Sequence, residues 1–162
     1  MQKIIGKNMQ KIRNVASVTT EKYVVVAYEK MNYDENGKKE SGGFYIANID
    51  KKVAKAEDLP EVYNNAEKIQ DTKGCIERVS LVLHKGIVFW AFYESGAAQW
   101  RHRLCYGVYN EPGNFRTCTD QECQGKVTSI TMGGLENGAV MFWNEENECE
   151  NLYMGHQRGH FL

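Results

Sequence analysis

Apolar and polar residues follow a pattern that recurs three times along the chain. Each copy opens on a short stretch in which apolar residues alternate with small or polar ones, which is typical of a half-exposed strand. These stretches lie at residues 15–18, 79–82 and 127–130. We therefore expect an outer strand at the start of each copy.

Each copy continues into a nearly unbroken apolar run that ends on a glutamate. The runs read YVVVAYE, VFWAFYE and AVMFWNE and end at Glu29, Glu94 and Glu145. Val, Phe, Trp and Tyr favour strands, and unbroken apolarity predicts a strand that is covered on both faces. The polar or glycine-rich segments just before the runs are suited to hairpin turns.

A third stretch of aromatic and small residues closes each copy, at residues 44–47, 104–107 and 152–155. Strand, hairpin, buried strand, polar loop and strand together make a β-meander. Residues 114–118 are a candidate fourth strand for the second copy. Residues 1–10 are a candidate to complete the sheet of the third.

The sequence thus predicts a single all-β domain over residues 1–162, because this length suits one domain. The three β-meander repeats are expected at about 12–50, 75–118 and 124–162.

An insertion at about 51–74 separates the first two copies. Pro60 can occupy the first turn of a helix, and Val62, Ala66 and Ile69 follow at helical spacing before Gly74. We expect one short helix here.

The order of the strands resembles the blades of β-propellers, including sialidase-like and lectin-like propellers, over residues 12–162. The resemblance implies a propeller-like arrangement of three blades, which two copies of the chain could close into a six-bladed ring. The Asp-box, WD and kelch signatures of such families are absent. A β-trefoil is an alternative, although its Gln-x-Trp signature is replaced by adjacent Gln99 and Trp100, and a sandwich or barrel is another.

Charge and hydropathy exclude some classes of partner. The formal net charge is −1, whereas proteins that bind nucleic acid usually carry a positive excess, so no nucleic acid partner is expected. The longest apolar runs, at residues 23–28 and 87–93, are far shorter than the roughly 20 residues of a membrane-spanning helix. No membrane association is expected either.

Five cysteines bear on compartment and metal binding. Their odd number leaves at least one thiol unpaired within the chain. A chain of this length can fold without disulfides and no apolar signal region is visible, which favours a cytoplasmic protein with reduced thiols, while a secreted one with two disulfides and one free thiol stays open. Cys118 and Cys123 are spaced like a ligand pair, with Cys149, His156 and His160 as further imaginable ligands, but a zinc site needs a second clear pair. We expect a local disulfide or two inert thiols, and no metal or cofactor.

The repeated glutamates are the first candidate site. If the copies are related by pseudo-symmetry, Glu29, Glu94 and Glu145 should cluster around an axis or line equivalent pockets. Clustered carboxylates can bind sugar hydroxyls or cations, or act as acid and base. The simpler interpretation, which we favour, is that each marks the point where a buried strand reaches water.

The tryptophans divide into two groups. Trp90 and Trp143 lie within the apolar runs and are expected in the core. Trp100 stands beside Arg101 and Arg103 after a Gly-Ala-Ala loop, and exposed Trp and Arg are common in binding hot spots. The alternative for these three residues is ordinary strand packing with solvated arginines.

No nucleophile elbow, phosphate-binding loop, HExxH motif or dinucleotide fingerprint is present. We therefore expect a non-catalytic module that binds a carbohydrate or a protein surface, and that forms a homo-oligomer, most simply a dimer. A self-assembling structural subunit is the first alternative, since free strand edges invite association. A glycosidase-like hydrolase that uses the glutamates is the second.

Overall fold

The computed structural model describes residues 9–52, 55–58, 66–96, 102–111, 113–123, 125–149 and 152–161. Within these ranges the side chains of residues 9, 58, 116–122, 147–149 and 152–161 are not described. The described residues form three open antiparallel sheets and contain no α-helix, which confirms the all-β prediction. A β-trefoil would instead need a closed barrel.

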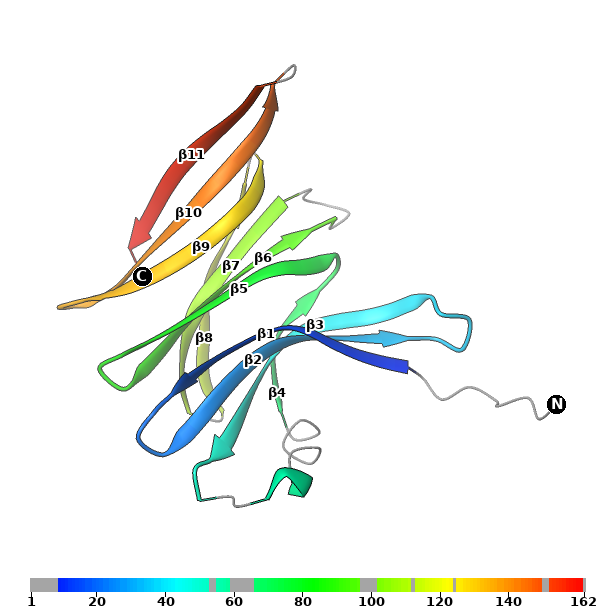
Figure 1. Ribbon diagram of the computed structural model, residues 1–162, viewed down its shortest axis with the longest axis vertical. Coiled ribbons are helices and arrows are strands. Elements are labelled where there is room, and N and C mark those ends of the chain that lie inside the picture. Colours follow the sequence, from blue (N-terminus) through cyan, green and yellow to red (C-terminus); the bar gives the residue numbers. More distant parts are fainter. Residues whose placement is uncertain are drawn as a thin grey trace.

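Each sheet is an antiparallel meander (Figure 1), and sheet A takes its fourth strand from the segment expected to be an insertion. Sheet A contains, in spatial order, β1 (Met9–Thr19), β2 (Tyr23–Tyr33), β3 (Lys39–Asp50) and β4 (Glu67–Thr72). Sheet B contains β5 (Cys75–His84), β6 (Ile87–Ser95), β7 (His102–Glu111) and β8 (Asn114–Glu122). Sheet C contains β9 (Lys126–Leu135), β10 (Gly138–Cys149) and β11 (Leu152–Phe161).

The insertion differs from the expected helix. A short 3-10 helix occupies Ala56–Asp58, and residues 67–72 form β4, which pairs antiparallel with β3. The free edge of β3 supplies hydrogen-bond partners there, and the strand buries Ile69 in the core. The helical prediction is therefore wrong for residues 67–72, while Pro60 and Val62 lie outside the described residues.

The expected role of the N-terminus is partly corrected. Met9 and Gln10 pair with Tyr33 and Asn32 of β2, so they belong to sheet A and do not complete sheet C. Residues 1–8 lie outside the described residues. The candidate fourth strand of the second copy is confirmed, because β8 pairs with β7 along its length.

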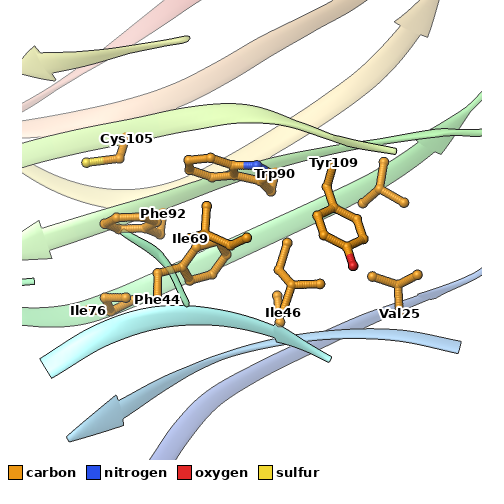
Figure 2. Packing of buried hydrophobic residues seen from close by; sticks show 11 residues of the cluster. Val25, Phe44, Ile46, Ile69, Ile76, Trp90, Phe92, Cys105 and Tyr109 are labelled. Carbon is orange, nitrogen blue, oxygen red and sulfur yellow. The ribbon is translucent and has the colours of Figure 1, made fainter. Parts of the chain in front are cut away.

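Sheet B lies between sheets A and C (Figure 1). The larger core fills the space between sheets A and B, where Phe44 packs against Trp90 and Phe92 with ring centroids 5.2 and 4.8 Å apart. Figure 2 shows Phe44 and Ile46 of sheet A facing these two rings. Large aromatic contacts of this kind fix how the two sheets stack.

A second core fills the space between sheets B and C. Tyr93 and Leu104 of sheet B meet Met141 and Trp143 of sheet C there. Trp90 and Trp143 are both buried, which confirms their predicted place in the core. β6 and β7 each contribute residues to both cores, so these two central strands of sheet B join the three sheets.

The expectation that all three apolar runs are covered on both faces holds for two of them. Residues 25–29 of β2 and 88–94 of β6 are buried without a break. In β10 the side chains alternate, because Met141 and Trp143 are buried while Phe142 is 38% exposed. The prediction of a strand covered on both faces is therefore wrong for the third run, because sheet C packs against sheet B with one face only.

Candidate functional site

The three repeated glutamates are buried. Glu29 and Glu94 are 0% exposed and Glu145 is 2% exposed. The interpretation that each marks where a strand reaches water is therefore wrong. A carboxylate can be buried at low cost only where donors satisfy its oxygens, so the partners of each glutamate decide its role.

Glu29 joins sheet A to the first residues of sheet B. Its Oε2 accepts a hydrogen bond from Arg13 Nε at 2.7 Å, and its Oε1 accepts one from the backbone N–H of Ile76 at 3.1 Å. Asn14 donates its side-chain N–H to the carbonyl of the same Ile76. Sheet A thus satisfies both backbone groups of a residue in sheet B.

A β-bulge between Arg13 and Ala16 prepares this contact. Asn14 lies in the bulge with φ +53°, a left-handed conformation that asparagine tolerates better than most residues. Arg13 pairs in register with Glu29 across β1 and β2, so its guanidinium reaches the carboxylate directly. The hydrogen bond from Arg13 to Glu29 raises the pKa of the arginine above its ordinary value.

Glu94 binds the residues that come just before Ile76 along the chain. Its Oε1 accepts hydrogen bonds from the backbone N–H groups of Lys73 and Gly74, which lie between β4 and β5. Its Oε2 lies 2.6 Å from a guanidinium nitrogen of Arg103, its register partner on β7. Glu29 and Glu94 therefore converge on the segment that joins sheets A and B.

Glu145 lies in the other interface. Its Oε1 accepts a hydrogen bond from the indole N–H of Trp143 at 2.9 Å, within the core between sheets B and C. Its backbone pairs with His156 of β11. The structure therefore brings two of the three glutamates together and places the third apart.

The direction of the glutamates also departs from the expected symmetry. Glu94 and Glu145 lie on the faces of sheets B and C that look toward the preceding sheet, with Trp90 and Trp143 respectively. Glu29 lies with Val25 and Ala27 on the face of sheet A that looks toward the following sheet. The first copy is thus reversed relative to the other two.

The remaining predicted site residues have different outcomes. Arg103 is largely buried, since its side chain is 12% exposed, and it binds Glu94 and the carbonyl of Asp71. The alternative of a solvated arginine is therefore wrong for Arg103. Trp100 and Arg101 lie outside the described residues.

A polar cluster at one end of sheet B was not predicted. We name it the β6–β7 cluster and define it as Glu77, Tyr93, Ser95 and His102. The hydroxyl of Tyr93 and Nδ1 of His102 are hydrogen-bonded at 2.6 Å, and the two rings stack with centroids 5.9 Å apart. Ser95 donates its hydroxyl proton to Glu77, and its backbone pairs with His102.

The β6–β7 cluster is only partly enclosed. Tyr93 is buried, whereas Glu77, Ser95 and His102 are half-buried. Burial, followed by the nearby Glu77, raises the pKa of Tyr93 to about 12, so its hydroxyl stays protonated at neutral pH. The only signal in the sequence was the position of Ser95 and His102 at either side of the loop with Trp100.

The β6–β7 cluster has the residue types of a hydrolytic triad in a different arrangement. A triad needs a nucleophile that donates to a histidine, which an acid in turn orients. Here Ser95 donates to the acid, and Nδ1 of His102 binds a tyrosine. The cluster can offer hydroxyl, carboxylate and imidazole groups to a ligand, and this geometry does not build a nucleophile.

Metal binding and disulfides can be assessed for part of the chain. The described residues contain no group of three His, Cys, Asp or Glu side chains that could hold a metal ion. Cys123 is buried, whereas the side chain of Cys118 lies outside those that the structure describes, so the choice between a local disulfide and two inert thiols stays a prediction. Among the parts of the chain that are described, no helix is long and apolar enough to cross a membrane.

Comparison with known proteins adds no family. No family model matches the chain, and neither a curated protein nor a solved structure is significantly similar to it.

Proposed function

We propose that this protein is a non-catalytic binding module that recognises its ligand at the β6–β7 cluster and the adjoining loop. The single observation that carries the proposal is the half-buried, hydrogen-bonded set of Glu77, Ser95 and His102 over the buried Tyr93. Polar groups held in fixed positions at a partly enclosed site give a ligand orientation and specificity.

The chemistry of the cluster favours a carbohydrate over a protein surface. Carboxylate, hydroxyl and imidazole groups can each exchange hydrogen bonds with sugar hydroxyls. Residues 96–101 join β6 to β7 at this end of the sheet and include Trp100 and Arg101. Aromatic side chains such as tryptophan suit the apolar face of a sugar, so we include Trp100 in the test of this site on sequence grounds.

The two alternative functions have weaker support. A glycosidase needs two carboxyl groups that flank a substrate, whereas Glu29, Glu94 and Glu145 are buried and bind internal donors. A self-assembling subunit would use free strand edges or sheet faces, and the described outer face of sheet C carries one exposed large apolar side chain, that of Phe142.

Binding of the intact protein to a glycan array tests the proposal. We expect His102→Ala and Trp100→Ala to lower binding about tenfold or more, while Lys85→Ala, at the opposite hairpin end of sheet B, should leave it unchanged. No binding to the array and none in a peptide-library screen would together contradict the proposal that the protein is a binding module. Peptide binding alone that is lost in His102→Ala would assign the site to a protein surface.

We also propose that the three sheets are propeller-like blades, as the resemblance of the sequence implied. The first strands follow one another, since β1 contacts β5 and β5 contacts β9, as the inner strands of neighbouring blades do. The reversed face of Glu29 is the feature that fits this arrangement least. An experimental structure with sheets related by a constant rotation would support the blades, and unrelated rotations would contradict them.

A further inference from the structure

Glu77 is the one carboxylate of the β6–β7 cluster, and it lies in a β-bulge. The register of β5 against β6 shifts between Ile76 and Arg78, so Glu77 is the extra residue of the bulge. Bulges of this kind re-aim a side chain and are common next to functional sites. The carboxylate of Glu77 accepts a hydrogen bond from the hydroxyl of Ser95 on β6. The fold therefore turns this carboxylate toward the cluster and holds it there.

The negative charge of Glu77 has no counter-charge among the described side chains. Glu29 and Glu94 each bind an arginine, whereas no described lysine or arginine forms an ion pair with Glu77. The guanidinium of Arg78 binds backbone groups instead, because Nε donates to the carbonyl of Thr128 and Nη1 to the carbonyl of Glu77. A half-buried carboxylate without a counter-charge attracts a cation more strongly than one in open water does.

The hydroxyl groups beside Glu77 are neutral. Burial, followed by the charge of Glu77, raises the pKa of Tyr93 to about 12, so this phenol keeps its proton at neutral pH. Ser95 donates its proton to Glu77, which leaves the lone pairs of its Oγ able to accept hydrogen bonds. A carboxylate also has more acceptor positions than the one that Ser95 occupies. The pair of Glu77 and Ser95 therefore suits a ligand group that donates several hydrogen bonds.

We infer that the ligand of the β6–β7 cluster is an amino sugar whose ammonium group binds Glu77 and Ser95. This inference rests on the proposed binding module and specifies the class of its ligand. An ammonium group carries one positive charge and three N–H donors, which match the unbalanced carboxylate and the serine oxygen. The N-acetylated sugar has a neutral nitrogen with a single N–H, so it lacks the charge-assisted hydrogen bond.

Calorimetric titration of the intact protein with chitosan and chitin oligomers of equal length tests this inference. The two probes differ only in their free or acetylated amines, and the free amines are mostly protonated at about pH 6.5. We expect the chitosan oligomer to bind about tenfold more tightly, which is the difference between a charge-assisted and a neutral hydrogen bond. Higher salt concentration should reduce this preference, because it screens the charges.

Glu77→Gln should abolish the preference for the free amine. Glutamine keeps a hydrogen-bonding group beside Ser95 but removes the charge, so binding of the chitin oligomer should be nearly unchanged. Glu136→Gln is the matched control, because it removes one negative charge from an exposed residue at the opposite hairpin end, where Lys85 binds its carbonyl. Circular dichroism checks that both variants keep the fold.

The outcomes separate this inference from the proposed binding module. Equal affinity of the unmodified protein for the two oligomers, or tighter binding of chitin, overturns the inference and leaves the module standing. A preference that persists in Glu77→Gln overturns it as well. Absence of binding to both oligomers also overturns it, and the glycan array and peptide-library screen then decide about the module. A lysine-containing peptide that binds more tightly than the chitosan oligomer would overturn the sugar as the source of the amine.

Discussion

At the scale of single residues, two of the repeated glutamates, Glu29 and Glu94, connect sheet A to sheet B through hydrogen bonds. Glu29 and Glu94 both accept hydrogen bonds from backbone N–H groups of residues 73–76, and an arginine binds each carboxylate. Side-chain carboxylates therefore take the place of strand carbonyls as acceptors for these backbone N–H groups. These glutamates therefore contribute to stability, whatever ligand the protein binds.

Replacing Glu29 with Ala should destabilise the fold by roughly 3 kcal/mol, because it leaves Arg13 and the N–H of Ile76 without their acceptor. Chemical denaturation measures this loss. Glu35→Ala, an exposed residue of the β2–β3 hairpin, is the matched control and should change stability by less than about 0.5 kcal/mol. Equal stability of the two variants would contradict the claim that the hydrogen bonds of Glu29 stabilise the connection between sheets A and B.

Two buried tyrosines should limit stability at alkaline pH. Burial raises the pKa of Tyr93 and of Tyr109 from the ordinary 10.0 to about 12. The unfolded chain releases these protons first, so stability should be constant below about pH 10 and should fall as the pH rises toward about 12.

Denaturant unfolding across this range, followed with the ultraviolet titration of tyrosine, measures the alkaline loss. Tyr109→Phe removes one of the two titrating groups, and with it the hydrogen bond from Asn48 Nδ2 at 2.6 Å. Its stability should start lower and fall less steeply above pH 10. An unchanged slope would show that Tyr109 does not contribute.

At the scale of elements, the β5–β6 hairpin of sheet B is hydrogen-bonded to the β9–β10 hairpin of sheet C. His84 donates a hydrogen bond from Nε2 to the carbonyl of Leu135, and Lys85 Nζ donates one to the carbonyl of Glu136. A Cβ at Gly134 would lie 2.1 Å from Nδ1 of His84. Glycine is needed here because the imidazole packs directly on the backbone of β9.

Gly134→Ala should therefore displace the ring of His84 and lose its hydrogen bond, at a cost of about 1 kcal/mol. In a His84→Ala background the same change should be neutral or slightly stabilising, because alanine restricts the unfolded chain more than glycine. A double-mutant cycle in thermal unfolding isolates this coupling. Additive effects would mean that the ring does not pack on Gly134.

At the scale of the whole molecule, three sheets share two cores through the central strands of sheet B, β6 and β7. β6 packs toward sheet A with Trp90 and Phe92 and toward sheet C with Ala91 and Tyr93. Sheet C is packed on one face only, and Phe142 on its other face is exposed. Local stability should therefore be highest in β6 and lower in sheet C.

Native-state hydrogen exchange tests this order. The amides of residues 88–94 should exchange slowest, and those of β9 and β10 should exchange through openings of lower free energy. Trp143→Leu should speed exchange in sheet C while leaving β6 and sheet A nearly unchanged. Uniform protection in all three sheets would contradict this separation.

Local pattern determined much of the architecture. The alternating and apolar stretches predicted the strands of all three repeats, because strand periodicity and β-branched or aromatic composition are local properties. The same locality explains the error at residues 67–72. Val62, Ala66 and Ile69 fit a helical spacing, but the free edge of β3 and the burial of Ile69 favoured a strand.

Only the tertiary structure decided what the polar residues do. The sequence singled out Glu29, Glu94 and Glu145 by their repetition but not their burial. Glu29 and Glu94 accept from Ile76 and from Lys73 and Gly74, which are far away along the chain, and the burial of Glu145 beside Trp143 depends on how sheet C packs on sheet B. It gave no means of pairing Glu77 with Ser95 or Tyr93 with His102, which depends on strand register. Strand identity follows from neighbours along the chain, whereas charge satisfaction, packing faces and sites follow from neighbours in space.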